Sequence, residues 1–288
     1  MVEQKEFSPG QNIGGAYRVV HRLGMGAAGT VYEVEHEPTG GKFALKAFTP
    51  RRGDLLLLKK KFLAEAKLLA RLDAPNIVKV RDSGIDDTTK LPYFVMDEVV
   101  YKDGYPHTLE DVDTSDLDEG FVKMWFEDLA AALDYIHQMG IVHRDIKCSN
   151  VLLRPDKHVM LSDFGISKIF SDRLARELQV TRTYAAGERR NASKTKFVMG
   201  TAGYMAPEVA RGYPATFRSD VYSLGVMIFR MLTGVWYEPG SAALEMLDMY
   251  ELRWDKVLPW MLEGDPGRRP HEIAGLVRLL PRHGEDGK

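Results

Sequence analysis

Residues 143–150 read His-Arg-Asp-Ile-Lys-Cys-Ser-Asn and place an acid, a lysine and an amide at fixed offsets. A second acid, Asp163, follows Asn150 by thirteen residues and is itself followed by Phe and Gly. Asp145 is spaced to orient a hydroxyl nucleophile and Lys147 to neutralise a phosphate, whereas Asn150 and Asp163 offer oxygen atoms to Mg²⁺. Five specified residue types at given offsets would recur by chance roughly once in a few million tries. The pattern therefore indicates phosphoryl transfer.

A glycine-rich turn over residues 24–31 lies between two strand-like runs. Glycines let the backbone approach phosphates closely and direct its N–H groups at them. Such a pattern also occurs by chance and in dinucleotide-binding folds, but no helix opens at Gly29, which argues against a dinucleotide site. Lys46 follows on the next predicted strand and can reach the α- and β-phosphates of a nucleotide, with Glu65 as its expected partner.

Two groups of elements must position these side chains. β-branched and aromatic residues separated by turn residues predict strands over residues 17–48, and strand character returns over residues 91–99. Apolar residues at helical spacing predict helices over residues 55–72 and 121–138. A small strand-rich part with one main helix thus precedes a larger, mostly helical part. This order predicts the α+β fold class, with the joint near residues 97–104.

Composition excludes several other classes of protein. The 288 residues are 44% hydrophobic and 28% charged, as in an ordinary soluble globular protein. The net charge of −2 provides no basic field, so no nucleic-acid partner is expected. A single cysteine excludes an internal disulfide and agrees with a reducing cytosol. Arg230 interrupts the most apolar stretch, residues 221–236, so we expect a buried helix there rather than a membrane span. We expect a cytoplasmic location, for the chain alone or as part of a longer protein.

Taken together, these motifs resemble those of a eukaryotic-type (Hanks-type) serine/threonine protein kinase. Residues 206–208, Ala-Pro-Glu, resemble the close of the activation segment of that family. Asp220 resembles the buried helix acid that braces the catalytic loop, and Arg269 resembles the partner of the Glu208 carboxylate. The run over residues 198–202 favours a bacterial member.

The resemblance implies a two-lobed protein kinase fold. Its small antiparallel β-sheet lobe with one main helix would span residues 17–98, and its larger, mostly helical lobe residues 99–280. Residues 1–16 and 281–288 would be terminal extensions.

The same resemblance implies a role for each candidate site residue. Asp145 would be the catalytic base, Lys147 would contact the γ-phosphate of ATP, and Lys46 would bind the other ATP phosphates. The Mg²⁺ ligands would be Asn150 and Asp163. The nucleotide would be held by the glycine-rich turn, the walls of the adenine pocket and the hinge: Leu23, Gly24, Gly26, Gly29, Val31, Ala44, Lys46, Glu65, Met96, Asp97, Val99 and Leu152. Leu69, His143 and Phe164 would stack in a hydrophobic column that links the lobes.

The acceptor class also follows from the resemblance. Lys147, two residues after the base, together with Thr201 resembles serine/threonine kinases, so ATP, Mg²⁺ and a protein substrate are the implied partners. Dual specificity remains open. One alternative is an inactive, kinase-like binding scaffold, although such proteins usually lose the equivalents of Lys46, Asp145 or Asp163, and all three are present here. Another is a small-molecule kinase, which the peptide-holding motifs around Thr201 and Glu208 argue against.

Regulation and specificity are predicted at a few further positions. Residues 163–208 are longer than is usual in the family and carry a basic, hydroxyl-rich run. Thr195 is the first choice for a phosphosite, with Thr181, Thr183 and Ser193 next. The implied phosphate-binding cations are Arg144, Lys168 and Lys61.

Substrate selection is predicted not to favour arginine. Ser149 and Arg230 stand where arginine-directed relatives have carboxylates, and a cation there would repel a substrate arginine. The acidic stretch over residues 97–119 is a solvated loop and helix start, or alternatively a docking surface for a basic peptide. Cys148 stands where many relatives have proline and is expected to be an unreactive thiol, with a redox switch as the alternative.

Overall fold

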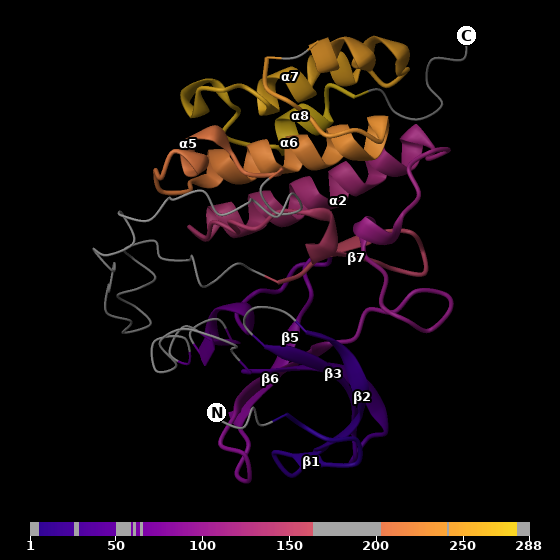
Figure 1. Cartoon of the computed structure of the whole chain (residues 1–288), viewed down its shortest axis with the longest axis vertical. Helices are drawn as coiled ribbons and strands as arrows, with labels where there is room; N and C mark the ends of the chain where they lie inside the picture. The colour runs from indigo at the N-terminus through magenta and orange to yellow at the C-terminus, as the bar shows by residue number, and fades with distance from the viewer. Residues whose placement is uncertain are drawn as a thin grey trace. The chain divides into compact units, whose positions relative to one another are not determined.

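The structure is a computed structural model that describes residues 6–25, 29–49, 59, 62–63, 66–163, 203–240 and 242–280. The chain divides into two compact units, Met1–Pro106 and His107–Lys288. Each unit has its own secondary structure, and the first is rich in strands whereas the second is mostly helical (Figure 1). The predicted α+β fold class is therefore confirmed, while the predicted lobe boundary between residues 98 and 99 stays a prediction.

A curled antiparallel sheet makes up most of the described part of the first unit (Figure 1). Its strands lie in the order β1-β2-β3-β4-β6-β5. Their bounds are β1 Asn12–Ile13, β2 Tyr17–Met25, β3 Thr30–His36, β4 Gly41–Ala47, β5 Val80–Ile85 and β6 Pro92–Asp97. The predicted helix over residues 55–72 lies largely outside the described residues, but residues 66–69 are helical.

One face of this sheet carries a hydrophobic core cluster of the unit. Tyr32 and Val34 on β3 and Leu45 and Ala47 on β4 alternate with side chains of the other face, as the two-residue period of a strand requires. Val95 on β6 completes this row and is fully buried. The candidate nucleotide-binding residues of β3, β4 and β6 lie on the opposite face of the same strands.

Two long helices organise the second unit. Helix α2 spans Glu119–Gln138 and begins at Asp118, whose carboxylate accepts a hydrogen bond from the Gly120 amide at 2.7 Å. Helix α6 spans Phe217–Thr233, begins with a capping box at Thr216, and ends at Gly234, whose φ of 72° favours glycine. The two helices pack side by side (Figure 1). Helix α2 was predicted from helical spacing, and α6 is the buried helix expected from the apolar stretch that Arg230 interrupts.

Shorter elements fill the rest of the described second unit. A two-stranded antiparallel hairpin, β7 Val151–Leu153 and β8 Val159–Leu161, follows the catalytic motif. The short α-helices are α5 Pro207–Ala210, α7 Leu258–Met261 and α8 Ala274–Val277. The 3₁₀ helices are η1 Leu109–Asp111, η2 Cys148–Asn150, η5 Ala242–Met249, η6 Trp254–Lys256 and η7 Pro266–Arg268.

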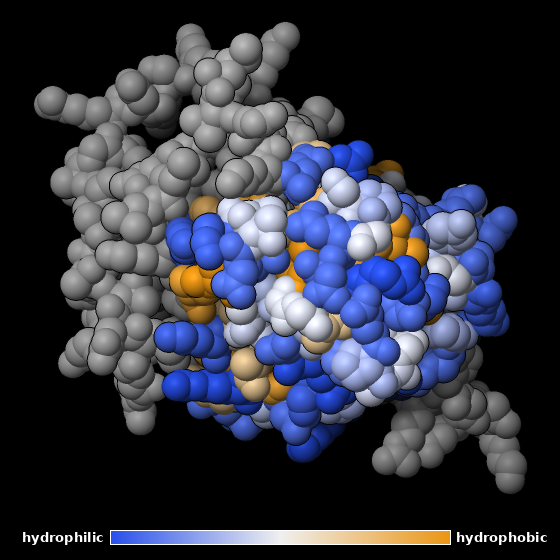
Figure 2. All heavy atoms as spheres, turned by 90° about the horizontal axis from the view of Figure 1, so that it is seen from below, coloured by the Kyte–Doolittle hydropathy of each residue, from blue (hydrophilic) through white to orange (hydrophobic). Residues whose placement is uncertain are grey.

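The described surface agrees with the composition. On the face shown in Figure 2, hydrophilic side chains predominate and apolar ones lie in small groups between them. Within the described ranges, no helix is long and apolar enough to cross a membrane.

Candidate active site

The candidate nucleotide-binding side chains of the first unit share one face of its sheet. Val31 on β3 lies opposite Lys46 on β4, and Ala44 on β4 lies opposite Met96 on β6. Residues directly opposite each other in an antiparallel pair point to the same face, and so do residues two apart in one strand. The fold therefore brings four of the predicted residues together on the face opposite the core cluster of Tyr32, Val34 and Leu45.

Lys46 is 7% exposed and its ammonium lies 5.9 Å from the centroid of the Phe94 ring. Phe94 is directly opposite Lys46 on β6. The aromatic face and the surrounding strands limit the directions in which this lysine can point. The contact with Phe94 was not expected from the sequence.

The glycine-rich turn is described at both of its ends. Gly24 pairs with Val31 across β2 and β3, and Leu23 precedes it in β2 next to a register shift. A Cβ at Gly29 would lie 2.0 Å from the carbonyl oxygen of Ala47, so only glycine fits there. Gly26 and Glu65 lie outside the described residues.

The predicted hinge begins at the end of β6. The Asp97 carboxylate is paired with Arg81, which donates to both of its oxygens at 2.6 and 2.7 Å. The Asp97 amide also has a partner within the sheet, because it donates to the Lys79 carbonyl oxygen at 2.9 Å. Val99 is buried. Leu152 lies on β7 in the second unit.

The candidate catalytic motif, residues 143–150, occupies the loop between α2 and β7, and Asp220 on α6 anchors it. The Asp220 carboxylate accepts hydrogen bonds from the backbone amides of His143, at 2.7 Å, and Arg144, at 2.8 Å. The His137 ring contacts the same carboxylate at 3.0 Å. Asp220 is 1% exposed, so these bonds form where water competes little. Asp220 therefore braces this loop as predicted, and Arg144 is held at a φ of 68°.

His143 is fully buried below the loop and its contacts identify the neutral imidazole. Its Nε2 lies 3.1 Å from the Ser162 carbonyl oxygen, to which it donates, and its Nδ1 accepts from the Asp145 amide at 3.3 Å. A ring that donates at one nitrogen and accepts at the other carries one proton. Burial lowers the pKa of His143, against the opposing influence of Asp220. His143 thereby fixes the backbone of Asp145.

The remaining motif residues converge on Asp145. The Asn150 amide donates to the Asp145 carbonyl oxygen at 2.8 Å and to its Oδ2 at 3.0 Å. The Lys147 ammonium lies 2.9 Å from the same Oδ2. Two donors thus hold a carboxylate that is about one-fifth exposed. An ionised carboxylate in this position can accept a proton from a hydroxyl group that approaches it from solvent.

The two predicted metal ligands are also adjacent. Asn150 Nδ2 lies 3.4 Å from the Asp163 carbonyl oxygen, and the Asp163 side chain is exposed. Because Asn150 uses Nδ2 for its protein contacts, its Oδ1 is the side-chain atom that can bind a cation. One amide oxygen and one carboxylate suit Mg²⁺, which prefers oxygen ligands and keeps several water or phosphate ligands. No group of three or more His, Cys, Asp or Glu side chains in the described part of the chain forms a dedicated metal cage.

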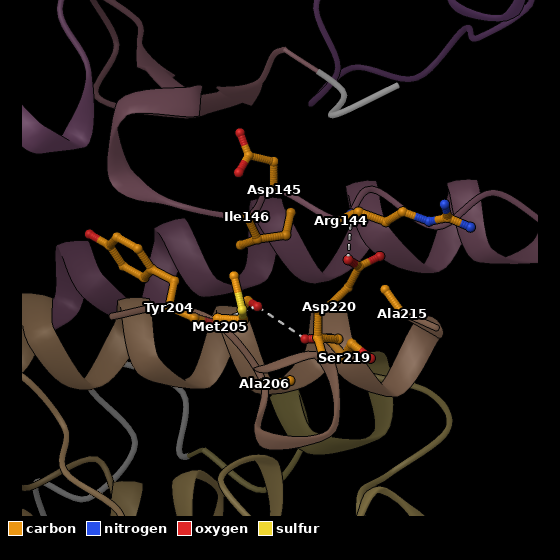
Figure 3. A pocket seen from close by; sticks show the side chains of 11 residues that line it. Arg144, Asp145, Ile146, Tyr204, Met205, Ala206, Ala215, Ser219 and Asp220 are labelled. Carbon is orange, nitrogen blue, oxygen red and sulfur yellow. Dashed lines mark hydrogen bonds between the residues drawn. The ribbon is translucent and has the colours of Figure 1, made fainter. Parts of the chain in front are cut away.

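A cavity of about 190 Å³ lies beside Asp145 in the second unit. Figure 3 shows Asp145 and Ile146 on one side, Tyr204 and Met205 on another, and Asp220 opposite them. Further lining residues are Arg144, Ala206, Val209, Ala215, Ser219 and Ser223. The cavity thus joins the catalytic loop to the segment that precedes Glu208.

That segment is fixed by a buried ion pair. Arg269 donates to both Glu208 carboxylate oxygens at 2.7 and 2.8 Å, and its side chain is fully buried. Ser219 donates to the same carboxylate at 2.8 Å. Burial acts to raise the pKa of Glu208, but the hydrogen bonds from Arg269 and Ser219 outweigh it and hold the pKa below its ordinary value. The partnership predicted for Arg269 and Glu208 is confirmed.

Several other predictions lie outside the described residues. These are Phe164, the phosphosite candidates Thr181, Thr183, Ser193 and Thr195, the cations Lys61 and Lys168, and Thr201. Leu69 is buried in the first unit.

The acidic stretch is used mostly for local structure. Asp111 accepts a hydrogen bond from the amide of Thr108, the N-cap of η1, Asp113 accepts one from the Ser115 hydroxyl, and Asp118 caps α2. Glu119 accepts the backbone amides of Glu251 and Leu252. These contacts favour the interpretation as a loop and helix start.

One member of the stretch behaves differently. Glu110 binds Arg230 through two hydrogen bonds at 3.0 and 3.1 Å. Sequence reasoning missed this pair, because 120 residues separate its members.

Comparison with known proteins agrees with the geometry. The sequence matches the protein kinase domain family over residues 17–252. It is 34% identical over 254 residues to serine/threonine-protein kinase PkaA of Streptomyces coelicolor, covering 83% of this chain and 42% of that protein. It is 33% identical over 233 residues to serine/threonine-protein kinase PknJ of Mycobacterium tuberculosis, covering 80% and 36% respectively. The chain thus spans less than half the length of these two relatives.

A solved structure is similar over almost the whole chain. The PknI kinase domain of Mycobacterium tuberculosis superposes with a TM-score of 0.66 at 27% identity, covering 95% of this chain and 98% of that chain.

Proposed function

Because the chain belongs to the protein kinase family, we propose that it transfers the γ-phosphoryl group of ATP to serine or threonine hydroxyl groups of a protein. The observation that carries the proposal is the convergence of Lys147 and Asn150 on the carboxylate of Asp145. The relatives with serine/threonine kinase names support the acceptor class. An enzyme that consumes ATP works where ATP is abundant, so we place it in the cytoplasm, alone or within a longer protein.

The residues of this chain divide the work of the reaction. Asp145 would orient the acceptor hydroxyl and take its proton, and Lys147 would neutralise charge on the γ-phosphate. Lys46 and the amides of the glycine-rich turn would bind the other phosphates, and the sheet face that carries Val31 and Ala44 would hold the base. Asn150 and Asp163 would bind Mg²⁺, which supplies charge neutralisation at the phosphate oxygens. Catalysis would then rest chiefly on positioning.

A transfer assay with radiolabelled ATP tests this proposal. The purified protein is incubated with Mg²⁺ and either a generic protein acceptor or a set of small-molecule alcohols and amines. We expect label on protein serine and threonine, and no transfer after Mg²⁺ is chelated. Transfer to small molecules alone would identify a metabolite kinase, and nucleotide binding without any transfer would identify a scaffold; either result contradicts the proposal.

We also propose that the enzyme phosphorylates its own activation segment, with Thr195 as the first site. The support in the described part of the chain is Arg144, whose backbone Asp220 fixes beside the catalytic base. An arginine there can bind a phosphate through charge-assisted hydrogen bonds. Mass spectrometry after incubation with ATP and Mg²⁺ maps the sites. We expect Thr195→Ala to lower activity, and a map without Thr195 together with full activity of this variant would overturn the assignment.

A further inference from the structure

The guanidinium of Arg230 is enclosed by partners of three chemical kinds. It makes two hydrogen bonds to the Glu110 carboxylate and donates a third, at 2.6 Å, to the Tyr204 hydroxyl. Its central carbon lies 4.4 Å from the centroid of the Trp236 ring. The Arg230 side chain is 24% exposed, so the bonds to Glu110 and Tyr204 are partly shielded from water. We call Glu110, Tyr204 and Trp236 the guanidinium site.

These three partners are the groups that recognise any arginine. A carboxylate that accepts two parallel hydrogen bonds matches the fork of a guanidinium, and an indole face attracts its positive charge. The hydrogen bond to Glu110 raises the pKa of Arg230 above its ordinary value, so the cation is permanent. The site is thus complete, and a residue of the same chain fills it.

The guanidinium site adjoins the cavity beside the candidate catalytic base. Tyr204 belongs to both, because its side chain binds Arg230 and it also lines the cavity together with Asp145 (Figure 3). Tyr204 is 3% exposed, its ring packs against Trp236 at 4.9 Å, and Ser223 donates to its carbonyl oxygen at 2.8 Å. Tyr204 therefore connects the Arg230 guanidinium to the cavity that an acceptor peptide would approach.

We propose that Arg230 determines substrate specificity by occupying, within its own chain, a site that would otherwise bind an arginine of the substrate. This inference rests on the proposed function, since it concerns the peptide that this active site accepts. In the parent enzyme a substrate arginine finds the Glu110 carboxylate already paired, and the pair as a whole carries no net charge. Occupancy, rather than repulsion by a lone cation as predicted from the sequence, is thus the reason for indifference to arginine.

Two single substitutions should change the specificity in opposite directions. Arg230→Ala empties the site and leaves Glu110, Tyr204 and Trp236 to receive a substrate arginine. Glu110→Gln keeps the cation but removes its carboxylate partner, so Arg230 can attract an acidic substrate residue. If the contacts of Arg230 only stabilised the fold, both variants would lose activity and neither would gain a preference for arginine or for an acidic residue.

A positional-scanning peptide library, read as kcat/KM, tests the proposal. We expect the Arg230→Ala variant to prefer arginine at one position by about tenfold or more, the size of one charge-assisted bidentate pair. The double variant with Glu110→Gln should lose this preference. The matched control is Arg154→Ala, which breaks another half-exposed pair of the second unit, Arg154 with Asp156 at 2.7 Å, and should leave the peptide profile of the parent unchanged.

Competition with a small guanidinium compound gives a second measurement. Ethylguanidinium at millimolar concentration should compete with the arginine peptide in the Arg230→Ala variant and have no effect on the parent. If that variant fails to fold, the acidic preference of Glu110→Gln decides the question. The proposal is wrong if Arg230→Ala gains no arginine preference, if the gain survives in the double variant, or if Glu110→Gln, used alone, keeps the parent profile. Absence of transfer by the parent enzyme would instead overturn the proposed function itself.

Discussion

The side-chain amide of Asn150 donates two hydrogen bonds to Asp145, one to its backbone carbonyl oxygen at 2.8 Å and one to its carboxylate at 3.0 Å. One amide group therefore fixes both the position and the direction of the candidate base. Since Asn150 Oδ1 is at the same time the candidate metal-binding atom, a single side chain couples the geometry of the base to the site of the cation.

Replacement of Asp145 by asparagine should abolish phosphoryl transfer and spare the fold. The amide has nearly the same shape as the carboxylate but cannot accept the hydroxyl proton, so we expect kcat to fall by about 10²–10⁴-fold or more. Binding of a fluorescent ATP analogue, measured by titration, should stay close to that of the parent. Asp156→Asn, in the turn between β7 and β8, is the matched control and should retain parent activity. Near-parent transfer by Asp145→Asn would show that another group serves as the base.

Loss of one partner of the buried pair of Glu208 and Arg269 should strongly destabilise the fold. Glu208→Gln leaves the fully buried Arg269 cation without its counter-charge, and we expect the free energy of unfolding to fall by about 3–5 kcal/mol. Arg269→Met should cost a similar amount, and the double variant should cost clearly less than the sum of the two. Urea denaturation measures all three. The exposed pair of Arg253 and Asp255 is the control, and its loss should cost no more than about 1 kcal/mol. Additive costs at Glu208 and Arg269 would contradict the pairing.

His143 should make the fold less stable as the pH falls below neutrality. Burial lowers its pKa in the folded protein from an ordinary value of 6.5, so below that pH the unfolded chain binds a proton that the folded chain does not. The free energy of unfolding therefore decreases with falling pH, by at most about 1.4 kcal/mol per pH unit from this residue. The same protonation would place an N–H where the ring accepts from the Asp145 amide.

Urea denaturation between pH 5 and 8 of the parent and of His143→Leu isolates this contribution, because all other histidines are common to both proteins. The variant should be less stable at pH 8 but should lose less stability toward pH 5. Parallel pH profiles would mean that His143 titrates alike in the folded and unfolded states.

The parts of the fold that depend on local spacing could be predicted from the sequence. Helix α2 follows from helical spacing, and α6 follows from the apolar stretch around Arg230. The strands from Tyr17 to Ala47 follow from β-branched and aromatic runs between turn residues, and the candidate catalytic loop follows from its motif. The hairpin of β7 and β8 was not predicted, because strands of three residues are too short to show a period of two.

Some side-chain pairs of the site could be predicted from the sequence, and others could not. Glu208 with Arg269 followed from the family resemblance, whereas the contact of Lys46 with Phe94 depends on the pairing of β4 with β6. The pair of Glu110 and Arg230 joins η1 to α6 across 120 residues. The sequence drew attention to Arg230 but did not indicate which residue of the acidic stretch would pair with it. Such a pair becomes visible only when the packing of the second unit is known.

Cys148 should resist alkylation in the folded protein. Its thiol is 1% exposed, lies 3.7 Å from the sulfur of Met231, and has a pKa that burial raises to about 11. Because the thiolate is the reactive form, its rate with iodoacetamide at pH 8 should be lower than that of a free thiol by roughly 100-fold or more. Cys148 is the single cysteine of the chain, so the intact mass reports its modification directly. The same protein unfolded in urea should react completely and serves as the control. Rapid alkylation of the native protein would show that the catalytic loop opens, and it would support the alternative of a redox-sensitive thiol beside the candidate base.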